Sequence, residues 1–207
     1  AVIETSSQGL LQHRELGIRY DIAVFTNLTP EHIEAHGGFE NYKKAKRRLF
    51  EYLVTLPPKK IQDQLVPRAA VLNAESDHAD YYASTPGLTN VHWYGIEKGN
   101  GLKAAHLELL PNGSHAEVNG YPMQLSVPGR YNVENMLAAL SVCQVLGVPL
   151  EAAIQKLENI KGLPGRFERV ELGQPWTVII DYAPEPESLK QLYAALAFVP
   201  HKRLIHV

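Results

Sequence analysis

Two apolar runs, Ile22-Ala23-Val24-Phe25-Thr26 and Ala69-Ala70-Val71-Leu72-Asn73, carry the pattern from which the fold can be predicted. Short runs of this kind, rich in β-branched and aromatic residues, are typical of buried strands. Residues 39–53 lie between them and read as one helix with an apolar face. That face consists of Phe39, Tyr42, Leu49, Phe50 and Leu53. Strands that alternate with helices predict a parallel sheet with crossover helices.

The pattern continues on both sides of this unit. We expect further strands at residues 1–5 and 91–94, and helices at residues 132–146 and 150–160, divided by Gly147-Val148-Pro149. Glycine is common where a helix ends, and proline is common where one begins. Between residues 102 and 127, Pro111-Asn112-Gly113 separates two extended runs, which predicts an antiparallel hairpin. The expected class is therefore α/β, with a mostly parallel sheet and an added hairpin.

A Gly/Pro-rich turn at residues 161–165 is the expected domain boundary. After it, strands are expected at residues 166–172 and 177–181, a helix at 186–198 and a strand at 203–207. The sequence thus divides into residues 1–162 and 163–207, the second part being the start of another α/β unit. Because the chain opens and closes on apolar strand-like runs, we expect it to be an internal piece of a longer protein.

Composition excludes several functional classes. The chain has 207 residues, of which 45% are hydrophobic and 20% charged, so it can bury a substantial core. A net charge of -2 gives no electrostatic footprint for nucleic acid. We expect neither a signal peptide nor a membrane-spanning segment, because the longest apolar stretches are interrupted by charge or Gly within about ten residues. Its single cysteine, Cys143, cannot form a disulfide within the chain. We expect a cytoplasmic protein.

Lys46 lies in the middle of the apolar face of the helix at residues 39–53. One interpretation is that its stem follows the edge of the core while the ammonium stays in solvent. The other is that desolvation and neighbouring cations lower the pKa of its amine, so that the amine reacts with carbon dioxide. The resulting carbamate would offer anionic oxygen to Mg²⁺. The other basic residues are expected to point elsewhere and stay in water. They are Lys43, Lys44, Arg47 and Arg48.

A series of short motifs runs along nearly the whole chain. They are Glu4-Thr5-Ser6-Ser7-Gln8-Gly9-Leu10, Gln12-His13-Arg14, Phe25-Thr26-Asn27-Leu28, Glu31-His32, His36-Gly37, Lys46, residues 129–135, Gly165-Arg166-Phe167-Glu168 and Asp181-Tyr182-Ala183. In kind, order and spacing these motifs resemble the Mur ligases. Within that family they most resemble the ligases that add the third amino acid of the peptidoglycan stem peptide to UDP-N-acetylmuramoyl-dipeptide.

The resemblance implies a three-domain enzyme. Residues 1–162 would form most of its central ATPase domain, without the Gly-rich phosphate loop, and residues 163–207 would begin a Rossmann-like C-terminal domain. The implied reaction uses ATP to convert a carboxylate into an acyl phosphate, which an incoming amine attacks. The implied partners are UDP-N-acetylmuramoyl-dipeptide and an amino acid, and the expected state is an inactive fragment of a monomer. Which amino acid is added cannot be read from these residues.

Three residues match the family's metal and phosphate positions. Glu4 matches a Mg²⁺-binding carboxylate, Lys46 matches a carbamylated lysine, and His32 matches a histidine near the metal and the transferred phosphate. Taken singly, Glu4 also fits a surface carboxylate at a strand end. A histidine shortly after Pro30 fits the start of a helix equally well. The resemblance favours the metal-site interpretation because all three positions match together.

Other motif residues match the positions that hold substrate and nucleotide. Ser6, Gln12 and Arg14 match contacts to the muramoyl peptide, although Arg14 also fits an exposed loop residue. The residues that match ATP contacts are Asn27, Asn135, Arg166 and Asp181. Asn27 could instead cap the next turn, Arg166 could form an ion pair at a strand edge, and Asp181 could be a plain strand-end carboxylate. Asn132 is expected to be the N-cap of its helix, which leaves Asn135 as the adenine contact.

One position departs from the family pattern. Where the family has Asp-Tyr-Ala-His-x-Pro, this chain has Asp181-Tyr182-Ala183-Pro184-Glu185-Pro186. Proline stiffens the loop and removes an imidazole donor. The change puts in doubt the detailed nucleotide contacts and the subfamily more than ATP binding itself.

Other functions stay open. A folylpolyglutamate-type ligase shares the fold and chemistry but matches the Ser6 to Arg14 motifs less well. An amidating synthase with a glutaminase partner typically carries a cysteine cluster, whereas Cys143 stands alone. A degenerate protein that binds nucleotide or cell-wall precursor without turnover is compatible with Pro184. Retention of Glu4, His32 and Lys46 together argues against that last reading.

Overall fold

The central sheet is mostly parallel. The computed structural model describes residues 1–30 and 33–207, and within them the largest sheet has six strands in the order β1-β4-β5-β6-β7-β8. These strands are β1 (Ile22–Phe25), β4 (Ala69–Asn73), β5 (Val91–Gly95), β6 (Leu102–Leu110), β7 (Gly113–Val118) and β8 (Tyr121–Leu125). The pairs from β1 to β6 are parallel, and β6, β7 and β8 pair antiparallel. The expected α/β class with an antiparallel addition is therefore confirmed.

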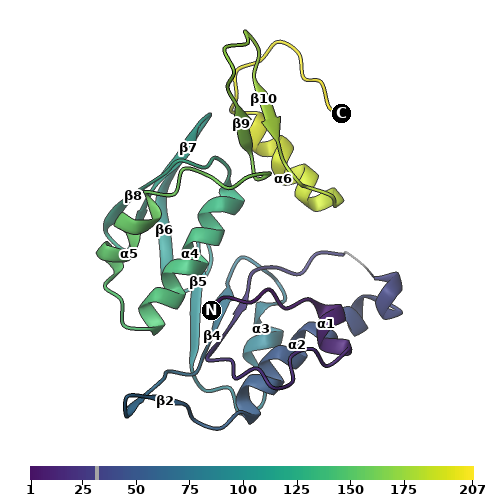
Figure 1. Ribbon diagram of the computed structural model, residues 1–207, viewed down its shortest axis with the longest axis vertical. Helices are drawn as coiled ribbons and strands as arrows, with labels where there is room; N and C mark the ends of the chain where they lie inside the picture. The colour runs from purple at the N-terminus through teal and green to yellow at the C-terminus, as the bar shows by residue number, and fades with distance from the viewer. Residues whose placement is uncertain (31–32) are drawn as a thin grey trace.

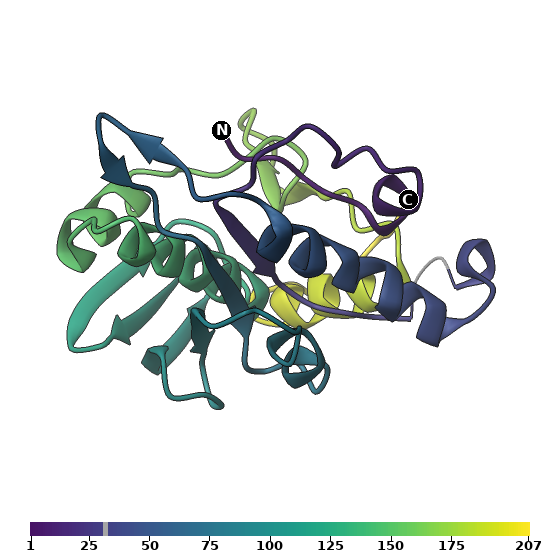
Figure 2. The ribbon, with the colours of Figure 1, turned by 90° about the horizontal axis from the view of Figure 1, so that it is seen from below.

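Strand β4 is covered on both faces, because its side chains alternate between two hydrophobic cores. Ala69 and Val71 belong to the core under helices α4 (Arg130–Val145) and α5 (Leu150–Leu157). Ala70 and Leu72 belong to the core under α2 (Phe39–Thr55) and α3 (Ala79–Ala83). Figure 1 shows the two groups of helices on opposite sides of β4 and β5. Figure 2 shows α2 running along its side of the sheet.

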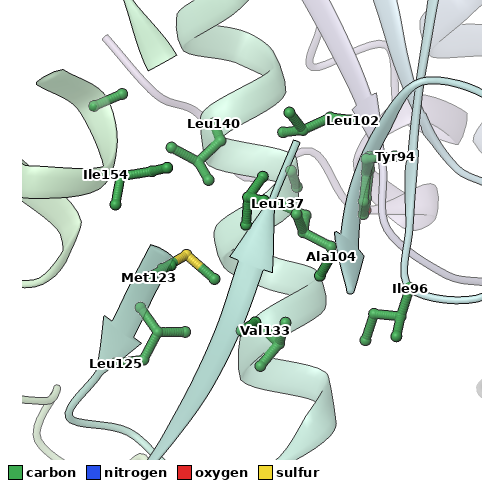
Figure 3. Packing of buried hydrophobic residues seen from close by; sticks show 14 of the residues in the cluster. Tyr94, Ile96, Leu102, Ala104, Met123, Leu125, Val133, Leu137, Leu140 and Ile154 are labelled. Carbon is green, nitrogen blue, oxygen red and sulfur yellow. The ribbon is translucent and has the colours of Figure 1, made fainter. Parts of the chain in front are cut away.

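Helix α4 supplies the centre of the larger core. Val133, Leu137 and Leu140 are fully buried at three- and four-residue spacing, as expected of a helix that packs on a sheet. Figure 3 shows these side chains facing strands β5, β6 and β8 and helix α5. Helix α4 ends at Val145, Gly147 has a φ of +77°, and α5 begins directly after Pro149. The expected helix boundary at residues 147–149 is confirmed.

Tight turns connect the strands of the antiparallel part. Leu110 pairs with Gly113 across Pro111 and Asn112, which confirms the expected hairpin. A second hairpin, not expected from the sequence, joins β7 to β8 through Asn119 and Gly120. Their φ angles of +47° and +88° match the two central positions of a type I′ turn.

The residues after 162 form a small unit of their own. It contains the antiparallel pair β9 (Glu168–Val170) and β10 (Val178–Ile180), followed by helix α6 (Pro186–Leu196). Its core consists of Phe167, Ala195 and Val199, against which Tyr131 of α4 packs. Figure 1 shows this unit next to the start of α4. Short elements elsewhere are α1 (Ser7–Leu11), the 3-10 helix η1 (Glu34–His36), and the paired strands β2 (Lys60–Ile61) and β3 (Gln64–Leu65).

The strands expected at residues 1–5 and 203–207 are wrong. Both segments are irregular, and Val2, Ile3, Ile205 and Val207 are exposed. An apolar run becomes a strand only where a neighbouring strand pairs with it and a core covers one face. Neither condition is met for these segments in the part of the chain that the structure describes.

The expected N-cap at Asn132 is also wrong. Helix α4 begins at Arg130, and Gly129, with a φ of +98°, occupies the N-cap position. Asn132 lies inside the first turn, where its amide donates a hydrogen bond to the Pro128 carbonyl at 2.7 Å.

No helix among the described residues is long and apolar enough to cross a membrane.

The α4 core provides a test of this packing. Leu137 has no exposed surface, so Leu137→Ala is expected to lower the free energy of unfolding by about 2–5 kcal/mol through lost burial and a residual cavity. Leu146→Ala, at a half-exposed position just after the same helix, is the matched control, with an expected change within about 0.5 kcal/mol. Urea denaturation followed by circular dichroism measures both. Equal losses in the two variants would contradict the packing described above.

Candidate functional site

The segment that starts at Glu4 presents several polar side chains to solvent. Ser6 caps α1, and its hydroxyl accepts a hydrogen bond from the Gly9 amide at 3.1 Å. Glu4, Gln12 and Arg14 are exposed around this short helix. The side chains expected to hold metal and substrate therefore lie on one short, accessible segment.

This segment is attached by polar contacts to the 3-10 helix η1, through His36, and to helix α2, through Arg48. The Ser7 hydroxyl lies 3.1 Å from Nε2 of His36, and both residues are buried. Glu15 is only 4% exposed, and its carboxylate lies 3.9 Å from the Arg48 guanidinium of α2. Arg48 also contacts Nδ1 of His13 at 3.0 Å. The exposed side chains are thus held in place next to the helix that carries Lys46.

Lys46 is half-buried, with its Nζ atom 5.0 Å from the centre of the Tyr42 ring. As expected, Tyr42, Phe50 and Leu53 on the same helix are buried. The half-buried position fits an amine that lies between the core and solvent.

The expectation that all neighbouring cations stay in water is wrong for two of them. Lys43 Nζ and the Arg47 guanidinium each lie 4.6 Å from the centre of the Tyr81 ring, and both side chains are largely covered. Long basic side chains can bury their stems on an aromatic surface while the charge interacts with the ring. Helical spacing alone does not show where such an aromatic partner lies.

Of the three residues expected to bind metal, the structure describes Glu4 and Lys46. His32 lies outside the described residues. Within the described ranges 1–30 and 33–207, no group of three or more His, Cys, Asp or Glu side chains is arranged to hold a metal. Mg²⁺ commonly needs only one or two protein carboxylates beside substrate phosphate and water. An exposed Glu4 and a carbamate on Lys46 would fit that kind of donor set.

A second group of polar side chains lies where the parallel strands end, at the carboxyl edge of the sheet. The Asn73 amide donates to the Thr26 carbonyl at 2.8 Å and to the Glu134 carboxylate at 3.0 Å. Arg130 contacts Glu134 at 3.3 Å and Glu75 at 3.5 Å. Asn27, expected to contact ATP, directly follows Thr26 and is exposed.

Glu75 is held by the loop after β5. Its Oε1 accepts three backbone hydrogen bonds, from Ile96 and Glu97 at 2.7 Å and from Lys98 at 3.0 Å. Burial by itself raises the pKa of Glu75. The three N–H groups and the Arg130 guanidinium outweigh that effect and hold the pKa below its usual 4.5.

Sequence reasoning missed this second group. The available signal was that Asn73 ends a buried strand and Glu75 follows it, since ligands of open α/β sheets bind outside the carboxyl ends of the strands. Arg130 and Glu134 lie in the motif at residues 129–135, beside the two asparagines Asn132 and Asn135.

The C-terminal unit places Arg166 and Asp181 beside the start of α4. Asp181 accepts hydrogen bonds from the backbone amides of Phe167 at 2.7 Å and Ala183 at 2.9 Å. The Arg166 guanidinium lies 5.5 Å from the Tyr182 ring. Burial, together with the negative charge of Asp181, raises the pKa of Tyr131 to about 12.

Asn135, the expected adenine contact, lies further along helix α4. It is exposed and lies one turn beyond Tyr131, which packs on the C-terminal unit. Helical spacing therefore places Asn135 on the same side of α4 as Tyr131. Pro184 lies in the loop before α6, where Glu185 and Ser188 form a capping box.

Comparison with known proteins identifies close relatives. A family model described as the Mur ligase middle domain matches residues 1–143. The UDP-N-acetylmuramoyl-L-alanyl-D-glutamate--2,6-diaminopimelate ligase of Halalkalibacterium halodurans is 39% identical over 197 residues, which is 93% of this chain and 38% of the relative. The enzyme of the same name from Listeria monocytogenes serotype 4b is 34% identical over 100% of this chain and 42% of its own length. The chain spans about two fifths of the length of these curated relatives.

Solved structures agree with this relationship. A UDP-N-acetylmuramoyl-L-alanyl-D-glutamate--2,6-diaminopimelate ligase matches with a TM-score of 0.72 and 28% identity, over 96% of this chain and 40% of that chain. The MurF ligase of Thermotoga maritima, solved in complex with ADP, matches with a TM-score of 0.74 and 23% identity, over 94% and 43% of the two chains. At 23% identity, the likeness to the MurF ligase supports the fold alone.

The environment of Glu75 predicts a pH dependence. Because its pKa is lower in the folded protein, ionised Glu75 stabilises the fold above about pH 5, and this contribution is lost as pH falls through 4.5 and below. Glu75→Gln is therefore expected to lower the free energy of unfolding by about 1–3 kcal/mol at pH 7, the usual size for hydrogen bonds to a charged group. The deficit relative to wild type should shrink at pH 3.5. Urea denaturation at both pH values measures it, and a deficit independent of pH would contradict the assignment.

Proposed function

This chain belongs to the Mur ligase family, and on that basis we propose that the protein is an ATP- and Mg²⁺-dependent amide-bond-forming ligase of peptidoglycan synthesis. Its substrates would be UDP-N-acetylmuramoyl-dipeptide and the amino acid that becomes the third residue of the stem peptide. The names of the relatives support this substrate class, and several of them are diaminopimelate ligases.

One structural observation carries the proposal. The exposed segment with Glu4, Ser6 and Arg14 is held against the helix of Lys46 by the Glu15–Arg48 contact. The Ser7–His36 contact holds it against η1, which precedes that helix. The groups expected to bind substrate and metal therefore lie on adjoining elements. Catalysis of phosphoryl transfer depends mainly on such positioning and on neutralisation of phosphate charge.

The proposed domain division follows the packing. Residues 1–162 would form most of the central domain, and residues 163–207 would begin the C-terminal domain. The separate core around Phe167 and Ala195 supports this boundary, as does the Gly/Pro-rich turn before it. In the longer protein, Asn27 and Asn135 of the central domain and Arg166 and Asp181 of the C-terminal domain would contact ATP. The family's Gly-rich phosphate loop would precede these residues.

In the proposed reaction, a carboxylate oxygen of the dipeptide attacks the γ-phosphorus of ATP, and ADP leaves. The amine of the amino acid then attacks the acyl carbon, and phosphate leaves as the amide forms. Arg14 would hold a carboxylate or phosphate group, since a guanidinium binds either through two parallel hydrogen bonds. Ser6 and Gln12 would orient the muramoyl peptide. A bound Mg²⁺ supplies positive charge beside the phosphates.

Glu4 and a carbamate on Lys46 would hold this metal, with His32 near the phosphate. The half-buried position of Lys46, beside the buried Tyr42 and Phe50, supports the carbamate, because partial burial disfavours the charged ammonium and favours the neutral amine that reacts with carbon dioxide. A carbamate would also change the cation into the oxygen ligand that Mg²⁺ prefers.

The proposal is tested by a ligation assay on the full-length protein that contains this chain. With ATP, Mg²⁺, UDP-N-acetylmuramoyl-L-alanyl-D-glutamate and either diaminopimelate or lysine, mass spectrometry should detect the tripeptide product together with ADP. Nucleotide binding without product would favour the non-catalytic reading that Pro184 permits. Ligation of glutamate to a folate substrate would instead place the protein with the folylpolyglutamate-type ligases.

Substitution of Lys46 tests the metal role. Lys46→Ala is expected to reduce ligation at least 10³-fold, a roughly 4 kcal/mol loss of transition-state stabilisation, because the oxygen ligand is lost. Small carboxylates such as acetate or formate should restore part of the rate. Lys44→Ala, which removes an exposed lysine of the same helix, is the matched control and should leave the rate unchanged. Full activity of Lys46→Ala without added carboxylate would rule out the metal role.

A further inference from the structure

We infer that Asn73, Glu75, Arg130 and Glu134 form a positioning network that sets the distance between the two ends of the nucleotide site. The inference rests on the proposed function, because it takes Asn27 and Asn135 as nucleotide contacts. None of the four network residues was among the expected site residues. Their role follows from how they connect β1, β4, the loop after β5, and α4.

The first link joins strand β1 to helix α4 through Asn73. One amide nitrogen donates both to the Thr26 carbonyl at 2.8 Å and to the Glu134 carboxylate at 3.0 Å. The Asn73 side-chain oxygen accepts from the Glu75 backbone amide at 3.0 Å. Asn73 is buried, so the loss of these partners would leave a polar amide uncompensated.

The second link joins helix α4 to the loops after β4 and β5 through Arg130. Its guanidinium contacts Glu97 at 2.9 Å, Glu134 at 3.3 Å and Glu75 at 3.5 Å. A guanidinium can serve three carboxylates at once because its five N–H groups point in different directions within one plane. Arg130 therefore fixes the first turn of α4 relative to two loops of the sheet edge.

The third link makes the loop after β5 rigid. Glu75 accepts the three amides of residues 96–98, a set of donors that would otherwise favour an anion. Two glycines allow this close approach. A Cβ atom on Gly95 would lie 2.8 Å from Oε1 of Glu75. Gly99 has a φ of +87°, and a Cβ atom there would lie 2.6 Å from the Cβ atom of Ala74. Small residues are thus required where the loop closes on Glu75.

The network matters because its end points are sequence neighbours of the nucleotide contacts. Thr26 precedes Asn27, and Glu134 precedes Asn135. A shift of α4 relative to β1 would therefore change the distance between the group proposed at the phosphate end and the group proposed at the adenine. Misplacement by about 1 Å can cost as much as 100-fold in a site that depends on geometry.

Arg130→Gln and Glu134→Gln in the full-length protein test the inference. Affinity is measured by calorimetry for two ligands, ATP and inorganic tripolyphosphate, each with Mg²⁺. We expect both variants to bind ATP about tenfold more weakly and tripolyphosphate within twofold of wild type, since only ATP spans both ends of the site. The two substitutions change charge in opposite directions, so a simple charge effect would move their affinities in opposite directions.

Asp77→Asn is the matched control. Asp77 forms an exposed ion pair with Lys98 at 2.8 Å, in the same region but outside the network. The Asp77→Asn protein should bind ATP and tripolyphosphate with the same affinities as the wild-type protein. Thermal unfolding identifies variants that fail to fold, and for those Arg130→Lys, which keeps the charge but not the planar fork, replaces Arg130→Gln with a smaller expected loss.

The outcomes separate this inference from the proposed function. A wild-type protein that does not bind ATP overturns the proposed function, and the inference with it. Wild-type binding of ATP with unchanged affinity in folded variants overturns the inference alone. Equal loss for ATP and tripolyphosphate also overturns it, because that result indicates direct contact with phosphate. Selective loss for ATP in both variants supports it.

Discussion

The burial of strand β4 on both faces is the constraint on which the rest of the structure depends. All five of its residues are buried, and alternate side chains enter the core under α4 or the core under α2. Helices must therefore cover both sides, and the polar residue that ends the strand, Asn73, is left at the carboxyl edge. The candidate nucleotide contacts Asn27 and Asn135 come from the two elements that Asn73 connects.

Much of the fold could be predicted because its main elements are determined locally. The continuous apolar runs of β1 and β4, the helical spacing in α2 and the Gly147 to Pro149 boundary need no tertiary context to be recognised. The wrong strand predictions concern the chain ends. Residues 1–5 and 203–207 have the composition of strands, but composition does not reveal whether a pairing neighbour is present. The Asn119-Gly120 dipeptide, at which the second hairpin turns, is itself a typical hairpin signal.

The candidate site was predictable in its parts but not in its assembly. Motif resemblance pointed to Glu4, Ser6, Arg14 and Lys46, and the structure places the first three on one exposed segment beside the helix of the fourth. The contacts that hold them were not predictable, because Glu15 and Arg48 are far apart in sequence and look like ordinary surface charges. The same holds for Glu75, whose partners are backbone amides of a loop 21 to 23 residues away.

The proposed chemistry makes the dipeptide carboxylate the nucleophile toward ATP, and isotope transfer tests this directly. The dipeptide substrate would be labelled with ¹⁸O in the carboxylate that becomes the amide, and the released phosphate would be analysed by mass spectrometry. An acyl phosphate places one carboxylate oxygen in the phosphate that leaves, so the account predicts one ¹⁸O in each phosphate released with product. Phosphate without ¹⁸O from a protein that makes the tripeptide would contradict it.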